Sequence, residues 1–131
     1  MRSLARECVF KYLYSKLFNP NDEGLFTVLI KDLNENDKIF ANELLSAVLE
    51  NKEQTLAKIE KLANGYKLNR LYNVDKCALL IGISELDNFR NTPVAVIVDE
   101  TVNLVAKYST ENSTDFVNGI LAAYVKEKFN G

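Results

Sequence analysis

Hydrophobic residues recur at spacings of three and four along most of the chain, which is the pattern of amphipathic helices. Two polar turn clusters, "NPNDEG" at 19–24 and "NEND" at 34–37, interrupt this pattern. The predicted helices cover 4–18, 25–33, a segment that follows Asn36 as its N-cap, 52–63, 74–87, 92–108 and a last segment that starts near Asn112 or Ser113. Short links join them, so the sequence predicts an all-α fold of about seven helices.

The same spacing predicts which residues are buried. In the first three helices they are Ala5, Cys8, Val9, Tyr12, Leu13 and Leu17, then Leu25, Val28, Leu29 and Leu33, then Ile39, Phe40, Leu44 and Val48. The 74–87 helix is apolar on nearly all sides, which predicts a central position. Gly65 is placed to end the fourth helix in the left-handed conformation. Residues 92–108 have some strand propensity, but their helical spacing holds over four turns and Thr92-Pro93 is a favourable helix start.

The last helix contains a residue pair that usually marks a turn. Asn118 and Gly119 lie within the apolar spacing of "DFVNGILAAY", residues 115–124. A glycine in the middle of a helix costs about 1 kcal/mol relative to alanine, so a compensating contact is expected. We expect Gly119 to let a second helix approach closely, and Asn118 to hydrogen-bond a neighbouring helix end or loop.

The residue inventory argues against catalysis and metal binding. The 131 residues include no histidine, and the five glycines form neither a P-loop nor a dinucleotide-binding pattern. Cys8 and Cys77 lie far apart in sequence, which suggests neither a zinc site nor a disulfide framework, so both are expected to be small core residues. We therefore expect a non-enzymatic protein with no cofactor and no metal ion.

Length and hydropathy predict one domain, residues 1–131, of a cytoplasmic protein. The longest apolar run, "CALLIGI" at 77–83, is much shorter than the roughly 20 residues that span a membrane. Arg2, Arg6 and Glu7 interrupt the N-terminal apolar residues, so no signal peptide is indicated.

Charge is distributed unevenly over a chain of net charge −2. Residues 1–18 carry four basic side chains and one acidic one, whereas 19–50 carry two basic and seven acidic ones. Either the two segments contact different partners or both are solvated helix faces. At four-residue spacing, the first helix aligns two cations and three aromatics, which could bind a partner or pack on other helices: Arg2, Arg6, Phe10, Tyr14 and Phe18.

Three segments, "ARECVFKYLYS", "VDKCALLIGISEL" and "DFVNGILAAY", occur in an order and at separations that resemble the NusB family of bacterial transcription antitermination factors. The similarity is almost continuous over residues 92–119. The resemblance implies two small helical bundles packed on each other. It also implies a non-catalytic protein that pairs with NusE, a small-subunit ribosomal protein. The heterodimer would bind single-stranded boxA RNA and favour processive transcription of ribosomal RNA operons, in an elongation complex with other Nus factors.

The resemblance also implies roles for individual residues. The basic end of the first helix would bind RNA through Arg2, Arg6 and Lys11. The surface for NusE would include Tyr14, Asp75, Asn112 and Phe116. The residues with a structural role would be Glu85, read as a hydrogen-bonding or ion-paired group, and Asn118 and Gly119 of the signature "FVNG".

This chain departs from the family pattern at four positions. Ser3 and Leu4 stand where the family is often basic, Leu80 where an arginine is common, and Asn112 where an acidic residue is common. Ser3, Leu4 and Leu80, together with the acidic net charge, keep open a helical adaptor with little or no RNA binding of its own. A NusB-like domain of an RNA-modifying protein is a further alternative, disfavoured by the match at both ends of the chain. Exposed aromatic residues leave open whether the protein alone is a monomer or a weak homodimer.

Overall fold

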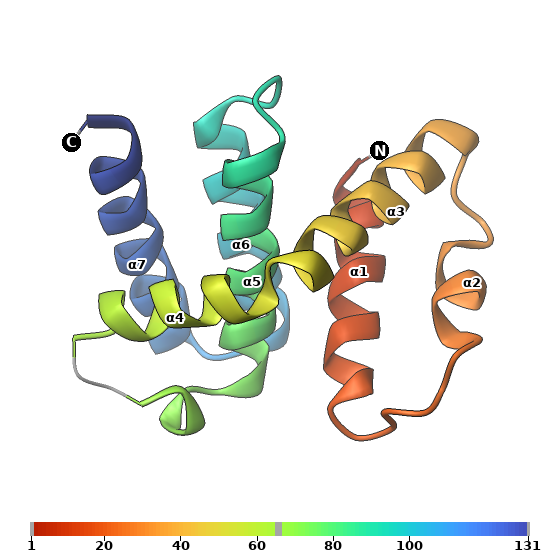
Figure 1. The fold of residues 1–131 in the computed structure, drawn as a ribbon, viewed down its shortest axis with the longest axis horizontal. Helices are drawn as coiled ribbons and strands as arrows, with labels where there is room; N and C mark the ends of the chain where they lie inside the picture. Colours follow the sequence, from red (N-terminus) through yellow and green to blue (C-terminus); the bar gives the residue numbers. More distant parts are fainter. Residues whose placement is uncertain (1, 65–66, 131) are drawn as a thin grey trace.

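A computed structural model describes residues 2–64 and 67–130, and every regular element in that part of the chain is helical (Figure 1). The elements are α1 (Arg2–Lys16), α2 (Leu25–Ile30), α3 (Glu35–Glu50), α4 (Lys52–Leu62), the 3-10 turn η1 (Leu68–Arg70), α5 (Asn73–Asn88), α6 (Val94–Tyr108) and α7 (Glu111–Asn130). The predicted all-α fold and its seven helices are confirmed for these residues. Gly65, predicted to end the fourth helix, lies outside the described residues.

The helices form two groups that meet along α5. In Figure 1, α1, α2 and α3 lie on one side of the molecule, and α4, α6 and α7 lie on the other. Helix α5 packs against α1 and α3 of the first group and against α4, α6 and α7 of the second. The arrangement of two packed bundles is therefore confirmed, and any polar group on the inner part of α5 must find its partners inside the protein.

The central position of α5 follows from its composition. Every residue from Cys77 to Leu86 is buried, because apolar side chains surround the helix axis and no side of the helix is suited to water. The predicted burial of this helix is confirmed. Glu85 is the one charged residue in this buried stretch, so its carboxylate needs a partner inside the protein.

Two helices begin at residues other than those predicted. Asn34, not Asn36, caps α3, since its side-chain oxygen accepts a hydrogen bond from the Asp37 N–H at 2.8 Å. Such a cap satisfies an amide that has no partner inside the helix. At α6, Pro93 rather than Thr92 occupies the N-cap position. Both boundaries shift by one or two residues, because neighbouring polar or proline residues give similar start signals.

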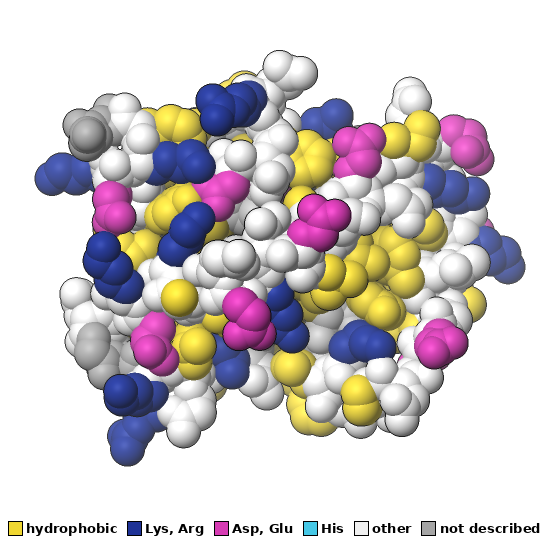
Figure 2. All heavy atoms as spheres, in the orientation of Figure 1, with side chains coloured by type: hydrophobic (Ala, Val, Ile, Leu, Met, Phe, Trp, Pro, Cys, Tyr) yellow, Lys and Arg dark blue, Asp and Glu magenta, His cyan; other side chains and the backbone are white. Residues whose placement is uncertain are grey.

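Several predicted core residues face solvent instead. Val28 is 67% exposed, Ile39 55% and Leu17 48%. Helix α2 has only six residues, and Phe26 and Ile30 supply its buried side. Figure 2 shows hydrophobic side chains at the surface of the region where α2 and α3 lie. In α2 the side that faces the core is therefore rotated from the predicted one. In α1 and α3 most of the predicted core residues are buried, and Leu17 lies beyond the end of α1.

The close helix approach occurs at Gly82 of α5, not at Gly119. A Cβ atom on Gly82 would lie 2.6 Å from the Oγ1 atom of Thr101 on α6 and 2.9 Å from its Cγ2 atom. Gly119 is exposed, and no atom outside its own helix turn lies within 4 Å of the Cβ position. Asn118 is exposed and forms no hydrogen bond to a described helix end. The packing roles predicted for Asn118 and Gly119 are therefore wrong.

Asp87 of α5 links α4 and α7 to the centre of the molecule. It accepts hydrogen bonds from Lys58 of α4 at 3.0 Å and from Lys128 of α7 at 2.6 Å, and the Tyr124 hydroxyl also donates to it. Burial by itself would raise the pKa of Asp87. The hydrogen bonds from Lys128, Tyr124 and Lys58 outweigh this effect and lower the pKa below its ordinary value of 3.8.

The stability supplied by Asp87 is therefore expected to depend on pH. A carboxyl with a lowered folded-state pKa stabilises the fold above its unfolded-state pKa, and this contribution is lost as the pH falls through the folded-state pKa. Asp87→Asn should have a lower Tm than wild type at neutral pH, and the gap should close as the pH falls below 3.8. Thermal unfolding across this range measures the gap. Asp99→Asn, at an exposed position, is the control, and a pH-independent gap for Asp87→Asn would contradict the expectation.

Neither cysteine is suited to reactions at the surface. Cys77 is buried, and burial raises the pKa of its thiol to about 11. Cys8 is half-buried, its pKa is also raised by burial, and its thiol donates to the Leu29 carbonyl at 3.2 Å. Among the described residues, no cluster of three or more potential ligands could hold a metal ion. Within the same residues, no helix has the length and apolar composition needed to cross a membrane.

Candidate functional site

Arg6 is buried where α1, α3 and α5 meet. Its Nε atom donates to Glu85 Oε1 at 2.7 Å and its Nη2 atom to Glu85 Oε2 at 2.5 Å. The guanidinium also lies 5.2 Å from the centre of the Phe40 ring. Arg6 is only 3% exposed, its Nε and Nη2 donors are used by Glu85, and its Nη1 atom lies 3.8 Å from Glu100 Oε1. This structure therefore does not present Arg6 at the surface, and its contact with RNA stays a prediction. Glu85 is ion-paired, as expected.

Arg2, at the start of α1, is exposed. Its guanidinium lies 4.4 Å from the centre of the Phe40 ring, and its Nη1 atom donates to Thr92 Oγ1 at 3.2 Å. Lys11 follows nine residues later, which is half a turn around the helix, and lies 3.6 Å from Glu7. The structure therefore does not bring Arg2 and Lys11 into one basic patch.

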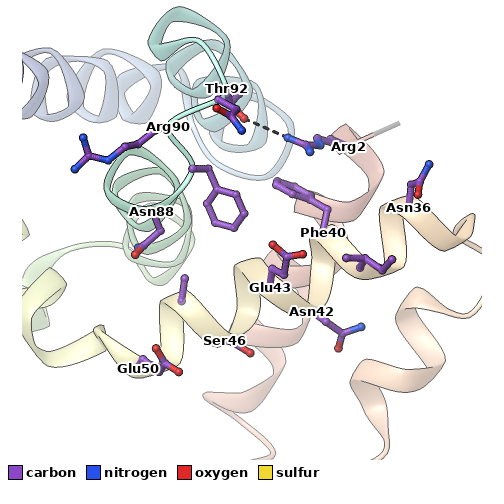
Figure 3. Close-up of a pocket in the computed structure, with 14 residues that line it drawn as sticks. Arg2, Asn36, Phe40, Asn42, Glu43, Ser46, Glu50, Asn88, Arg90 and Thr92 are labelled. Carbon is purple, nitrogen blue, oxygen red and sulfur yellow. Dashed lines mark hydrogen bonds between the residues drawn. The ribbon is translucent and has the colours of Figure 1, made fainter.

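A groove of about 1140 Å³ opens beside Arg2, between α3 and the link from α5 to α6 (Figure 3). It is larger than the roughly 300 to 1,000 Å³ of typical small-molecule sites, so it suits an extended chain better. The rings of Phe40 and Phe89, one from each wall, lie with their centres 5.3 Å apart and their planes at 70°. Phe40 is buried, whereas Phe89 is half-buried and partly accessible from the groove.

Sequence reasoning missed the link between α5 and α6 as part of a site. Its sequence "NFRNTP", residues 88–93, places an aromatic ring and a cation in a short connection, where small polar residues are the usual choice. Arg90 is exposed and has no ion-pair or hydrogen-bond partner among the described residues. An aromatic residue and a free cation together in a link were the signal that could have identified this surface.

A second, smaller hollow of about 360 Å³ lies beside Tyr14 of α1. Its other walls are residues 72–74 at the start of α5 and residues 108–110 at the end of α6. Tyr14 is half-buried, and its ring centre lies 6.2 Å from that of Phe10 and 5.3 Å from that of Phe18. Phe10 and Tyr14 stack, whereas Phe18 follows the end of α1 and its ring is tilted by 55° relative to that of Tyr14. The three predicted aromatic residues therefore lie in a row from the core to the surface.

Asp75 lies behind this hollow and is only 3% exposed. Burial raises the pKa of its carboxyl, although hydrogen bonds from Ser113 and Ser109 act in the opposite direction. Its Oδ1 atom has no hydrogen-bond partner among the described residues. The structure corrects the expectation that Asp75 presents a carboxylate at the surface: the carboxyl is buried at the start of α5.

Asn112 and Phe116 lie on the first two turns of α7. Asn112 is exposed, and Phe116 is half-buried against the hydrophobic core. Thr110, which lines the hollow beside Tyr14, caps this helix because its Oγ1 atom accepts a hydrogen bond from the Ser113 N–H at 3.2 Å. The structure thus places the start of α7 at the edge of the Tyr14 hollow.

The two-bundle helical fold, with its aromatic groove and its tyrosine-lined hollow, is that of a small all-α binding protein. The NusB family model matches residues 3–126, and the chain belongs to the NusB family. It is 36% identical to transcription antitermination protein NusB of Methylacidiphilum infernorum (isolate V4), over 96% of this chain and 91% of the relative. It is 35% identical to the protein of the same name from Acetivibrio thermocellus, over 97% and 90% of the two chains.

Solved structures show the same similarity. A NusB from T. maritima superposes with a TM-score of 0.91 at 29% identity, over 97% of this chain and 92% of that one. A chain in a crystal structure of antitermination factors NusB and NusE in complex with double-stranded RNA superposes with a TM-score of 0.86 at 28% identity, over 96% of both chains.

Proposed function

We propose that this protein is a cytoplasmic, non-catalytic transcription antitermination factor. Together with NusE it binds single-stranded boxA RNA and, in an elongation complex with other Nus factors, promotes processive transcription of ribosomal RNA operons. The observation that carries the proposal is similarity over nearly the whole chain to proteins named transcription antitermination protein NusB. The structural similarity to a NusB chain bound to NusE and RNA supports the same partners. All 131 residues act as one binding unit.

The RNA side of the proposal rests on Arg2 and the groove beside it. Arg2 is exposed, and its position over Phe40 orients the guanidinium at the rim of the groove. Arginine pairs with phosphate through two donors and stacks on unpaired bases, so this position suits single-stranded RNA. Lys11, on the other side of α1, supplies at most a separate phosphate contact.

Removal of the Arg2 side chain is expected to weaken RNA binding and to make the RNA affinity depend less steeply on salt concentration. Each phosphate contact to a single strand contributes about −0.7 to the slope of log K against log salt concentration. Arg2→Ala should therefore make the slope for a boxA-containing RNA shallower by about 0.7, measured by fluorescence anisotropy on the complex with NusE. Lys31→Ala removes the same charge from an exposed position outside the groove and should leave the slope unchanged. Equal slopes for all three proteins would contradict a phosphate contact by Arg2.

The partner side rests on the hollow beside Tyr14, with Asn112 and Phe116 near its edge. Tyr14 offers a ring held by its neighbours and a hydroxyl, a combination that suits a protein interface. Asp75 acts indirectly, because its carboxyl is buried at the start of α5. Gly119 is exposed about two helical turns after Asn112, so this side of α7 is open to contact, whereas Asn118 is exposed on a different side of the helix.

Tyr14→Ala is expected to weaken NusE binding by about 1 kcal/mol or more, which is the loss typical of a side chain that is important for an interface. Isothermal titration calorimetry with NusE measures the change. Phe129→Ala removes an exposed ring at the far end of α7 and is the control. Unchanged NusE affinity in a folded Tyr14→Ala variant would reject this surface.

A helical adaptor that lacks RNA binding is the second candidate, because Arg6 is buried and Leu4, at a position often basic in the family, is 57% exposed. RNA titrations with and without NusE separate the two. Binding that is absent in both conditions, while NusE still binds, would favour the adaptor.

A further inference from the structure

The α3 wall of the groove beside Arg2 presents two carboxylates, those of Glu43 and Glu50. Glu43 points from α3 into the groove (Figure 3), is exposed, and forms no ion pair with any described cation. Asn88 donates one of its two amide hydrogens to the Ser84 carbonyl at 2.8 Å, and its side-chain oxygen has no hydrogen-bond partner among the described residues, so this oxygen can accept one. A group that donates hydrogen bonds therefore fits this part of the groove.

The cations of the groove lie elsewhere, at its two sides. Figure 3 shows Arg2 at one side and Arg90 at the other, with Glu43 between them on α3. An unpaired carboxylate in a site for a polyanion repels phosphate, so its position needs a chemical reason. Arginines at the rim and acceptors in the interior match a nucleotide, whose phosphates are anionic and whose base edge can donate hydrogen bonds. A basic peptide would match Glu43 but would be repelled by both arginines.

Phe89 supplies a surface on which a base can stack. It is half-buried, and its contact with Phe40 holds the ring in place. Phe40 itself is buried beneath Arg2 and Arg6, so it supports Phe89 and is not free to stack on a base. Unstacked bases of single-stranded RNA commonly bind to aromatic rings in this way.

We propose that this groove binds one unstacked RNA base on Phe89 and that Glu43, with Asn88, selects guanine over uracil. The proposal rests on the proposed RNA-binding function and adds base selection to it. The Watson–Crick edge of guanine carries two adjacent donors, N1–H and N2–H, which can bind both oxygens of one carboxylate. Uracil offers a single N3–H between two carbonyl acceptors, and these would face the acceptors of the groove.

The test compares two fluorescein-labelled RNAs, a uridine 12-mer and the same 12-mer with one central guanosine. Binding to the full chain in complex with NusE is measured by fluorescence anisotropy. A bidentate contact to a base should make the guanosine RNA bind about 5- to 150-fold more tightly. A third RNA with inosine in place of guanosine lacks the N2 amino group and should lose most of this preference.

The matched variants are Glu43→Gln and Glu50→Gln, since both residues line the groove on α3 and are exposed. Glu43→Gln should reduce the preference for guanosine to less than about threefold, because the amide replaces one acceptor with a donor. Glu50→Gln removes the same charge and should keep the preference. Phe89→Leu should weaken binding of both RNAs, because every base has a face that can stack on an aromatic ring.

Three outcomes overturn the inference. Equal binding of the uridine and guanosine RNAs by the wild-type complex would show that the groove does not select guanine, while leaving the proposed function intact. Equal effects of Glu43→Gln and Glu50→Gln on both RNAs would show that Glu43 affects RNA binding only through its negative charge and does not select a base. If no RNA of any sequence bound to the complex, including boxA-containing RNA, the proposed function would fail together with the inference.

Discussion

Arg6→Ala is expected to lower the free energy of unfolding by about 3 to 5 kcal/mol, the usual cost of removing one partner from a buried ion pair. Both oxygens of Glu85 accept hydrogen bonds from Arg6, and both residues are almost completely buried. Alanine would leave the Glu85 carboxylate buried without its cation and leave a cavity beside Phe40. Urea denaturation followed by circular dichroism measures the change.

The control is Arg2→Ala, which removes the same side chain from the exposed start of the same helix and should change stability by less than about 0.5 kcal/mol. Replacing the whole pair, as Arg6→Met with Glu85→Leu, should recover much of the lost stability because no charge remains buried. A stable Arg6→Ala variant that had lost RNA affinity would restore Arg6 as a direct RNA contact.

Gly82→Leu is expected to cost about 3 kcal/mol, the upper part of the range for overpacked cores. Even a Cβ atom at this position would overlap the Thr101 side chain on α6, which is itself buried. The helices α5 and α6 would have to separate, which disturbs the centre of the fold. The midpoint of urea unfolding should therefore fall without a change in the m-value.

Gly119→Leu is the matched control, since it makes the same substitution within a helix but at an exposed position with no neighbour near the Cβ atom. It should raise stability by about 0.5 to 1 kcal/mol, because leucine has a higher helix propensity than glycine. Thr101→Ala in the Gly82→Ala background should relieve part of the overlap. If Gly82→Leu and Gly119→Leu had equal stability, the close approach of α5 and α6 would be contradicted.

The sequence alone determined the helices, the central position of α5 and the class of protein. Periodicity depends on the local spacing of side chains, and α5 is apolar around its whole axis, so its burial needed no knowledge of its neighbours. The resemblance to the NusB family rested on three sequence segments in the same order, and the family match over residues 3–126 confirms it. Helix boundaries and the buried face of α2 were less certain, because adjacent capping and apolar residues give competing signals.

Only the tertiary structure decided which of two residues of the same type is buried and which is exposed. Arg2 and Arg6 occupy the same line on α1, but Glu85 lies opposite Arg6, so one arginine is internal and the other is at a groove. Gly119 had the unusual sequence context, whereas Gly82 has the close neighbour. The groove itself joins α3 to the link between α5 and α6, which are far apart in the chain. Helical spacing defines a face of each helix, but the crossing of helices decides what that face meets.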